Sequence, residues 1–302
     1  MAWSKQFNII KMSNPLVSVV INCHNSDQYL KTAIDSVFEQ TYDNWEIIFW
    51  DNASSDKSAN IAKSYGSRVR YFYNPTKTNL GSARNSALSK VRGDLIGFLD
   101  CDDVWHPTKL EEQLKLFDQN PNLGFVYSKA EVIDSNNMII DEIPFIKNLP
   151  KDSIFTQLCQ TNFIPFPSVL CSTKKLIEIG GVPEHLKTST DYAIFLALSN
   201  LYPALPIEST TCSYRVHANM NSHTYRIISV MENISILKGY LPSKSALKGI
   251  KNHFITLIFE SYRAKDYSNL KLELFFKYFS FYYFFRRVII GLIRDGNSKY
   301  RI

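Results

Sequence analysis

The chain contains few cysteines, and their spacing carries no pairing signal. Its 302 residues include five cysteines, an odd number, and no two of them form a Cys-x-x-Cys pair. This argues against a disulfide framework and against a zinc site built from thiolates. We therefore expect reduced thiols and a cytoplasmic protein. The five positions are Cys23, Cys101, Cys159, Cys171 and Cys212.

Long apolar runs are also missing. No segment reaches the roughly 20 apolar residues that a helix needs to cross a bilayer. The first residues, Met1 to Gln6, lack the apolar stretch of a signal peptide. We therefore expect a soluble or peripheral protein rather than one that spans a membrane.

The positive charge is unevenly distributed. With 45% hydrophobic and 14% aromatic residues, the chain can bury one large domain with an appendage. Its net charge is +6, and residues 271–302 hold seven basic and two acidic side chains, so this segment alone carries +5. A basic segment rich in aromatics favours an anionic membrane surface over nucleic acid as a partner.

Strand and helix patterns alternate in the first hundred residues. Short apolar runs predict strands, and start signals such as Ser26 followed by 3.6-residue periodicity predict helices. Such alternation predicts a mostly parallel α/β sheet with helices on both faces. The predicted strands are 16–21, 45–50, 69–73 and 95–99, and the predicted helices are 26–40, 54–65 and 81–89.

The pattern loosens after a helix predicted at 107–119. Short strands are expected at 124–127, 169–171 and 211–214, and helices at 174–179 and 191–199. Beyond about Met231 only helical patterns remain, so we predict a domain over 1–235 and a helical appendage over 236–302.

One last helix is expected to carry an apolar face. This helix either packs on the domain or lies on lipid, and both can hold at once. The face comprises Leu274, Tyr278, Phe281, Phe285, Val288 and Leu292.

An acidic cluster follows the fourth predicted strand. Asp100, Asp102 and Asp103 stand at its carboxyl end, the edge where open α/β sheets bind ligands. Hard oxygen ligands such as these carboxylates suit Mg²⁺ or Mn²⁺. The alternative is an acidic turn that caps the helix beginning at Pro107.

An ordered set of segments resembles family 2 glycosyltransferases. The match covers about residues 15 to 222 in the usual order and spacing, although each segment alone is weak. The matching segments are VSVVINCHN (17–25), AIDSVFEQTY (33–42), WDNASSD (50–56), NLGSARN (79–85) and FLDCDDVWHP (98–107).

The resemblance implies a GT-A fold, a UDP-sugar donor and Mn²⁺ or Mg²⁺. It assigns direct metal ligation to Asp102, with Asp103 and His217 in the same metal site, and directs Asp100 at the ribose or donor sugar. Asn22-Cys23-His24 replaces the usual Pro-Thr-Tyr, and Asn52 replaces a frequent Asp. The implied nucleotide-sugar residues are Asn22, Cys23, Asn25, Asp51, Asn52, Arg84, Asp100, Cys101 and Asp102.

By the same resemblance, Asp191 aligns with the catalytic base, while Thr190 stands where the family carries Glu. The alternative for Asp191 is a helix cap. His217 and Arg215 fall in a Y-R-x-H segment, where His217 contacts the metal or diphosphate or is structural. The alternative for Arg215 is an ordinary surface charge. Phe166, Ser168 and Trp105 are assigned to the acceptor side; a buried connection is the alternative for 162–168.

Together these features predict a metal-dependent inverting glycosyltransferase. It would move one sugar from a UDP-sugar to a lipid-linked glycan in surface polysaccharide synthesis, such as lipopolysaccharide or capsule, as a peripheral protein on the inner face of the cell membrane. A sugar-phosphate nucleotidyltransferase would need a Gly-rich phosphate loop after the first strand, which residues 23–26 do not provide. A non-catalytic glycan-binding module is the third alternative, and the intact Asp102, Asp103 and Asp191 argue against it.

Overall fold

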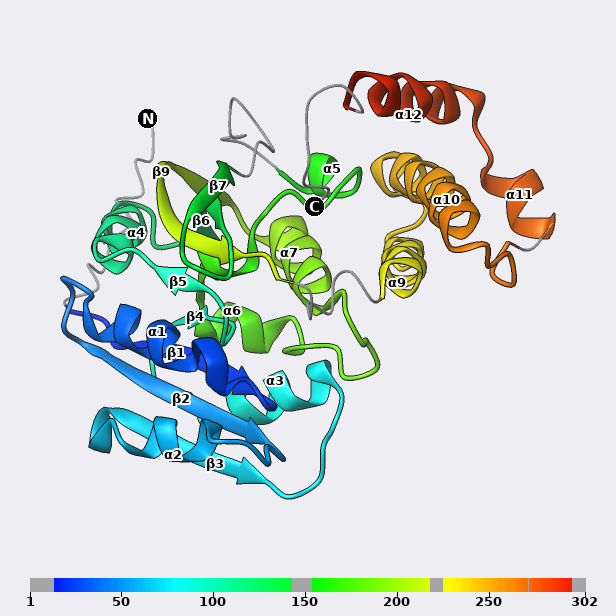
Figure 1. Ribbon diagram of the computed structural model, residues 1–302. Helices are drawn as coiled ribbons and strands as arrows, with labels where there is room; N and C mark the ends of the chain where they lie inside the picture. Colours follow the sequence, from blue (N-terminus) through cyan, green and yellow to red (C-terminus); the bar gives the residue numbers. More distant parts are fainter. Residues whose placement is uncertain (1–13, 143–153, 218–224, 271, 295–302) are drawn as a thin grey trace, which may run out of the picture. The chain divides into compact units, whose positions relative to one another are not determined.

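The computed structural model describes residues 14–142, 154–217, 225–270 and 272–294 (Figure 1). Contacts divide the chain into two compact units. The first comprises Met1–Ile154, Phe163–His185 and Ala197–Ala218, and the second comprises Phe155–Asn162, Leu186–Leu196 and Asn219–Ile302. The boundary between residues 235 and 236 stays a prediction; the second unit also takes in two earlier segments.

The first unit begins with four parallel strands. They lie in the order β3-β2-β1-β4, each parallel to its neighbour. The strand positions predicted from the apolar runs are confirmed to within two residues. The strands are β1 (Val17–Cys23), β2 (Trp45–Asn52), β3 (Val69–Asn74) and β4 (Leu95–Phe98), and the helices between them are α1 (Asp27–Phe38), α2 (Ser58–Lys63) and α3 (Leu80–Leu88).

The other half of the sheet is mixed. β8 pairs antiparallel with β4, β6 antiparallel with β8, and β9 parallel with β6, while β5 and β7 pair antiparallel with β9 and β6. The expected α/β architecture is therefore present, with antiparallel strands added after β4. These strands are β5 (Val104–Trp105), β6 (Phe125–Ile133), β7 (Ile139–Glu142), β8 (Leu170–Ser172) and β9 (Ala204–Arg215), and the helices are α4 (Lys109–Gln119) and α6 (Thr173–Glu178).

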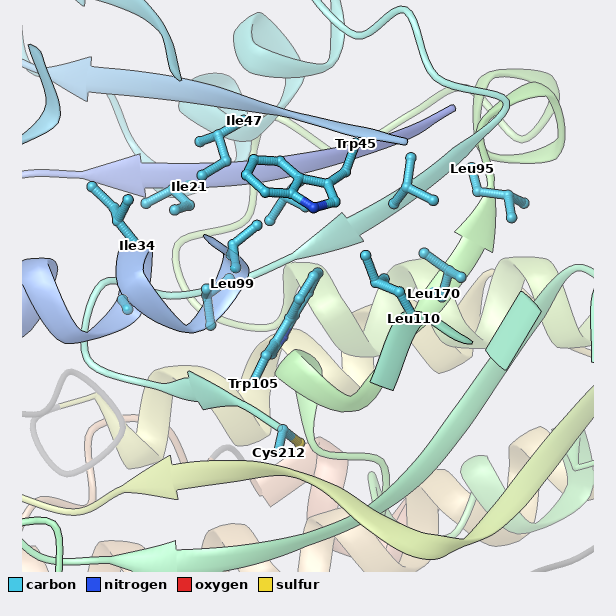
Figure 2. Close-up of a cluster of buried hydrophobic side chains, with 14 of the residues drawn as sticks. Ile21, Ile34, Trp45, Ile47, Leu95, Leu99, Trp105, Leu110, Leu170 and Cys212 are labelled. Atoms are coloured by element: carbon cyan, nitrogen blue, oxygen red, sulfur yellow. The ribbon is translucent and has the colours of Figure 1, made fainter. Parts of the chain in front are cut away.

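One hydrophobic core lies on a single face of this sheet. Alternate residues of β1, such as Val19 and Ile21, are fully buried there because successive side chains of a strand point to opposite faces. Helices α1 and α4 contribute Ile34 and Leu110 to the same cluster (Figure 2). Burying each such large apolar side chain contributes about 1.5–3 kcal/mol.

Trp105 is the largest fully buried side chain in this core. It is 1% exposed and faces β4 at Gly97, where an added Cβ would lie 2.6 Å from the indole ring. Only glycine leaves room for the ring at this point. The short strand β5 therefore fixes the segment that follows the acidic cluster.

A lysine is buried beside Trp105. The Lys109 ammonium lies 4.8 Å from the Trp105 ring centroid, and it donates hydrogen bonds to Gln113 Oε1 (2.7 Å) and to the Ser168 carbonyl (2.9 Å). Burial lowers the pKa of Lys109 from 10.5 to about 7. Between these values the unfolded chain binds more protons than the folded chain, so stability rises with pH.

This linkage gives a first testable prediction. Raising the pH from about 7 to about 9 should increase the free energy of unfolding through Lys109 by about 2 kcal/mol. Lys109→Met should lose this increase, whereas Lys115→Met, at an exposed position of the same helix, should keep it. Urea unfolding at the two pH values measures both. An equal increase in wild type and Lys109→Met would contradict the assignment.

The second unit is helical. In it, α10 approaches the segment after α5 so closely that a Cβ on Gly249 would lie 2.0 Å from the Cys159 carbonyl oxygen. Tyr192 donates a hydrogen bond to the Leu158 carbonyl at 2.8 Å. The helices are α5 (Phe155–Leu158), the first turns of α7 (Thr190–Leu201), α9 (Arg226–Lys238), α10 (Lys244–Ala264), α11 (Leu272–Tyr278) and α12 (Phe281–Arg294).

The tail is not the single helix that the sequence predicted. The expected helix over 274–292 is wrong in this respect, because Phe279 and Ser280 separate α11 from α12. Tyr278 and Tyr283 are buried, and Phe284 stacks on Phe259 with ring centroids 5.6 Å apart. Part of the tail thus packs on α10. Within the described ranges, no helix is long and apolar enough to cross a membrane.

Candidate active site

The predicted nucleotide-binding residues of the first unit gather at the carboxyl edge of the parallel strands. Cys23 pairs in register with Asp51 of β2, and the Cys101 thiol donates to the Asn22 carbonyl at 3.2 Å. The acidic cluster therefore lies directly beside the end of β1. Ligands of open α/β sheets bind at this edge.

Arg84 of α3 connects the acidic cluster to an aromatic pair. Its guanidinium donates to Asp100 Oδ1 at 3.0 Å and lies 4.0 Å above the Phe166 ring, which stacks on Phe98. Burial raises the pKa of Asp100; the Arg84 charge opposes this rise and the Asp102 charge adds to it. Arg84 therefore holds Asp100 in place. Because Arg84 also packs on the Phe166 ring, Phe166 lies next to the acidic cluster.

Asp102 presents an accessible carboxylate next to His217. Its side chain is 33% exposed, and its Oδ2 lies 3.0 Å from Nε2 of His217. The His217 ring also packs against Tyr29 of α1, with centroids 5.3 Å apart. The structure thus brings His217 to the acidic cluster, 115 residues along the chain from Asp102.

Asp103 differs sharply from Asp102. It is 1% exposed; its Oδ1 accepts the backbone N–H of Arg215 at 2.9 Å, and its buried Oδ2 has no hydrogen-bond partner in the described structure. Burial, together with the neighbouring charges of Asp102 and Asp100, raises the pKa of Asp103 well above its usual value. This geometry favours Asp102 over Asp103 as an exposed ligand; the metal role of Asp103 stays a prediction.

Arg215 is buried and binds the backbone of the acidic loop. The side chain is 1% exposed, so the alternative of an ordinary surface charge is wrong. Its Nε donates to the Asp102 carbonyl at 2.7 Å, its Nη1 donates to the Asp134 carbonyl at 2.8 Å, and the guanidinium lies 4.5 Å from the Tyr29 ring centroid. The Y-R-x-H spacing was the only sequence signal for this role.

The donor atoms at the cluster fit a divalent cation shared with a substrate. No group of three His, Cys, Asp or Glu side chains forms a metal site by itself in the described ranges. Mg²⁺ and Mn²⁺ in phosphate-binding sites use one or two protein ligands together with substrate phosphates. The accessible Asp102 carboxylate beside the His217 imidazole matches such a partial ligand set.

Several predicted nucleotide contacts are engaged within the protein. Asp51 accepts from Ser54 N–H (2.8 Å) and from Tyr71 O–H (2.6 Å). The Asn52 amide donates to the Thr78 carbonyl at 2.8 Å and accepts its N–H at 3.0 Å. Asp51 and Asn52 therefore hold neighbouring loops at this edge of the sheet, and direct nucleotide contact stays a prediction for both.

The side chains of Asn22 and Asn25 differ in their hydrogen bonding. Asn25 Oδ1 accepts the Ser55 N–H at 2.7 Å. The Asn22 side-chain nitrogen is buried and has no hydrogen-bond partner in the structure as described. Buried amide groups are normally paired, so Asn22 is the donor best suited to an incoming base.

The predicted acceptor-side residues lie deeper than the sequence suggested. Ser168 is fully buried, and its hydroxyl donates to the Pro165 carbonyl at 2.7 Å. Trp105 belongs to the core, and Phe166 is 8% exposed beneath Arg84. Burial gives no support to direct acceptor contacts by Trp105 and Ser168, which stay predictions.

Asp191 belongs to the second unit. Helix α7 begins at Thr190, so Asp191 lies in its first turn rather than at the residue before it. Its Oδ2 accepts a hydrogen bond from the Asn162 amide at 2.9 Å. Its catalytic role stays a prediction.

A carboxylate from α9 fixes the chain before Asp191. Glu232 accepts the backbone N–H groups of Lys187 (2.7 Å), Thr188 (3.0 Å) and Ser189 (2.9 Å). These three donors together hold the start of α7. No local sequence pattern indicates this arrangement, because 43 to 45 residues separate the partners.

Comparisons with known proteins give a family model and several relatives. The family model described as "Glycosyl transferase family 2" matches residues 18–171, which is 154 of 302 residues. An uncharacterized glycosyltransferase of Rickettsia felis is 31% identical over 213 residues, covering 69% of this chain and 35% of the relative. WfgD of Escherichia coli, a UDP-Glc:alpha-D-GlcNAc-diphosphoundecaprenol beta-1,3-glucosyltransferase, is 35% identical over 129 residues, covering 42% of this chain and 51% of WfgD. The chain thus spans about a third to a half of these two relatives.

Two solved structures share the fold at low sequence identity. Staphylococcus aureus TarS 1–349 in complex with UDP-GlcNAc superposes with a TM-score of 0.62 at 16% identity, covering 85% of this chain and 76% of TarS. The mannosyltransferase PcManGT of Pyrobaculum calidifontis, in complex with GDP-Man and Mn²⁺, also gives 0.62, at 15% identity, covering 96% and 82%.

Proposed function

Because the chain belongs to glycosyl transferase family 2 and has a GT-A fold, we propose that it transfers one sugar from a UDP-sugar to a lipid-linked glycan with inversion at the anomeric carbon. The observation that carries the proposal is the accessible Asp102 carboxylate beside His217, at the carboxyl edge of the parallel strands. The name of WfgD, a UDP-Glc enzyme with a diphosphoundecaprenol acceptor, supports the choice of donor and acceptor class.

Donor binding uses the first unit. Asn22 donates to the pyrimidine edge, and Asp100, held by Arg84, accepts from the ribose or donor-sugar hydroxyls. Asp102 and His217 would hold the divalent cation, whose positive charge stabilises the leaving diphosphate. Arg215 keeps the Asp102 backbone in place while the cation and the donor are bound. The domain over 1–235 is the catalytic part in this proposal.

Asp191 is the base in the same proposal. Its carboxylate accepts the proton of the acceptor hydroxyl as that oxygen attacks the anomeric carbon. Asn162 orients the carboxylate, and Glu232 anchors the helix that carries it. Attack from the side opposite the leaving diphosphate inverts the anomeric configuration.

The direct test is release of UDP. UDP-glucose, UDP-galactose and their N-acetyl forms are incubated with the protein, Mn²⁺ and a lipid-linked saccharide, and free UDP is measured. One of them should give acceptor-dependent UDP release that EDTA stops. Because PcManGT was solved with GDP-Man, GDP-mannose is the comparison donor. Release from GDP-mannose but from no UDP-sugar would contradict the uridine assignment.

The lipid-linked acceptor requires access to a membrane surface, and we propose that 236–302 provides it on the cytoplasmic face. Aromatic side chains of α11 and α12 are exposed: Phe276 (80%), Phe281 (70%) and Phe285 (58%). Lys277 and Arg286 are exposed on the same two helices. Exposed aromatics beside basic residues match the interface of an anionic bilayer.

Membrane binding gives a second prediction. Phe276→Ser combined with Phe281→Ser should weaken binding to vesicles containing anionic lipid by at least about tenfold, since each lost phenyl group removes apolar area. Tyr262→Ser, which removes another exposed aromatic (71%) from α10, should have little effect. Vesicle sedimentation measures all three proteins. Equal binding by the double variant and wild type would refute the role of this surface.

A further inference from the structure

Two cysteines lie near the ends of neighbouring parallel strands: Cys23 is the last residue of β1, and Cys101 lies in the turn that follows β4. Val20 pairs with Phe98 in the β1–β4 register, and Cys23 and Cys101 each follow three residues later. Both belong to the core cluster on one face of the sheet, as do Ile21 and Leu99. The Leu99 N–H donates to the Val20 carbonyl at 3.0 Å, so the chain stays beside β1 just past the end of β4.

The two thiols lie close together at the end of β1. The Cys101 thiol donates to the carbonyl of Asn22, the residue before Cys23, at 3.2 Å, and the Ser54 hydroxyl lies 3.9 Å from Cys23 Sγ. The hydrogen bond from Cys101 lowers the pKa of Cys23, and those from Ser58 and Ser54 add to this effect, although burial opposes it. The same hydrogen bond, together with burial, raises the pKa of Cys101 well above its usual value, and burial alone raises the pKa of Cys159 and Cys171 to about 12.

We propose that Cys23 and Cys101 form an oxidisable dithiol at the nucleotide-binding edge, and that its disulfide weakens nucleotide binding. The oxidant class is a small peroxide such as hydrogen peroxide, because the two residues are only 2% and 5% exposed. Cys23 sulfur attacks one peroxide oxygen, which gives a sulfenic acid and one water. Cys101 sulfur then displaces the hydroxyl group as a second water. Two thiols lose two protons and two electrons, and the peroxide is reduced to two waters.

The disulfide would disturb the residues on both sides of it. A sulfur–sulfur bond of about 2.05 Å is much shorter than a hydrogen bond between thiols, so one or both strand ends must shift. Cys101 stands between Asp100 and Asp102, and Cys23 follows Asn22. A shift of either residue therefore moves groups that the proposed function assigns to the donor. The effect on binding rests on that proposed function, whereas disulfide formation does not.

The test treats the full chain with hydrogen peroxide and maps its peptides by mass spectrometry without reduction. We expect a Cys23–Cys101 cross-link that dithiothreitol reverses, with slower reaction by the bulkier glutathione disulfide. Cys23→Ser and Cys101→Ser should each abolish the cross-link, and Cys171→Ser should keep it. Peroxide that leaves both thiols free, or oxidises them without joining them, would overturn the proposal.

UDP binding supplies the second readout. The cross-linked wild-type protein should bind UDP in the presence of Mn²⁺ at least about tenfold more weakly than the reduced protein, and dithiothreitol should restore the affinity. Unchanged affinity in a fully cross-linked sample would overturn the proposed effect. If the reduced protein fails to bind UDP while the cross-link still forms, the donor assignment fails and the dithiol stands.

Discussion

Asp102→Asn is expected to abolish metal-dependent UDP binding and to lower kcat/KM by about 10³-fold or more. The neutral amide removes the accessible carboxylate that faces His217. The fold should survive, because the Asp102 side chain is one-third exposed and Arg215 binds its backbone carbonyl. Calorimetric titration of UDP with and without Mn²⁺ measures the effect on binding.

A matched control separates this effect from a general loss of charge. Asp43 is exposed and precedes β2, at the sheet edge opposite the acidic cluster. Asp43→Asn should bind UDP as wild type does. Mn²⁺-dependent UDP binding by Asp102→Asn at wild-type affinity would show that the cation is held elsewhere.

Asp191→Asn should separate donor binding from transfer. We expect kcat to fall by about 10²–10⁴-fold, the range for removal of a general base, with UDP affinity unchanged. Asparagine keeps the shape of the side chain and still accepts from Asn162, so positioning should be preserved. Initial rates of acceptor-dependent UDP release measure kcat.

The control for Asp191 lies in the same unit. Asp266 is exposed and accepts from Ser268 N–H at 3.0 Å. Asp266→Asn should retain wild-type kcat. If Asp191→Asn transfers sugar at the wild-type rate, Asp191 is not the base, and its place in the first turn of α7 has a structural reason.

The parallel strands were predictable because burial imposes a simple pattern. β1 and β2 are covered on both faces, so they appear in the sequence as continuous apolar runs bounded by polar residues. The acidic cluster was equally visible, because carboxylates directly after such a run must lie at the carboxyl edge. Assigning it to nucleotide-sugar chemistry required the family resemblance.

The long strands β6 and β9 were predicted too short. β6 continues through Lys129 and Glu131, and β9 includes Pro206 and Glu208, which interrupt the apolar signal. Their pairing also shifts register around Lys129. Polar residues are tolerated there because parts of both strands remain partly exposed.

The sequence-based prediction also missed that two charged side chains are buried. Arg215 and Lys109 are placed inside by tertiary hydrogen bonds to backbone carbonyls, and no local pattern encodes such bonds. The unequal environments of Asp102 and Asp103 follow from the same cause, because strand β9 supplies the N–H that binds Asp103. Two neighbouring aspartates thus have different environments because a strand distant in the sequence contacts only one of their carboxylates.

The account depends most on a cation held at Asp102 against the pyrophosphate of UDP. A crystal structure of the protein with UDP and Mn²⁺ tests it directly, since anomalous scattering locates the manganese. We predict manganese bound to the Asp102 carboxylate and to the diphosphate, with the uracil beside Asn22. A nucleotide bound elsewhere, or manganese without contact to Asp102, would contradict the account.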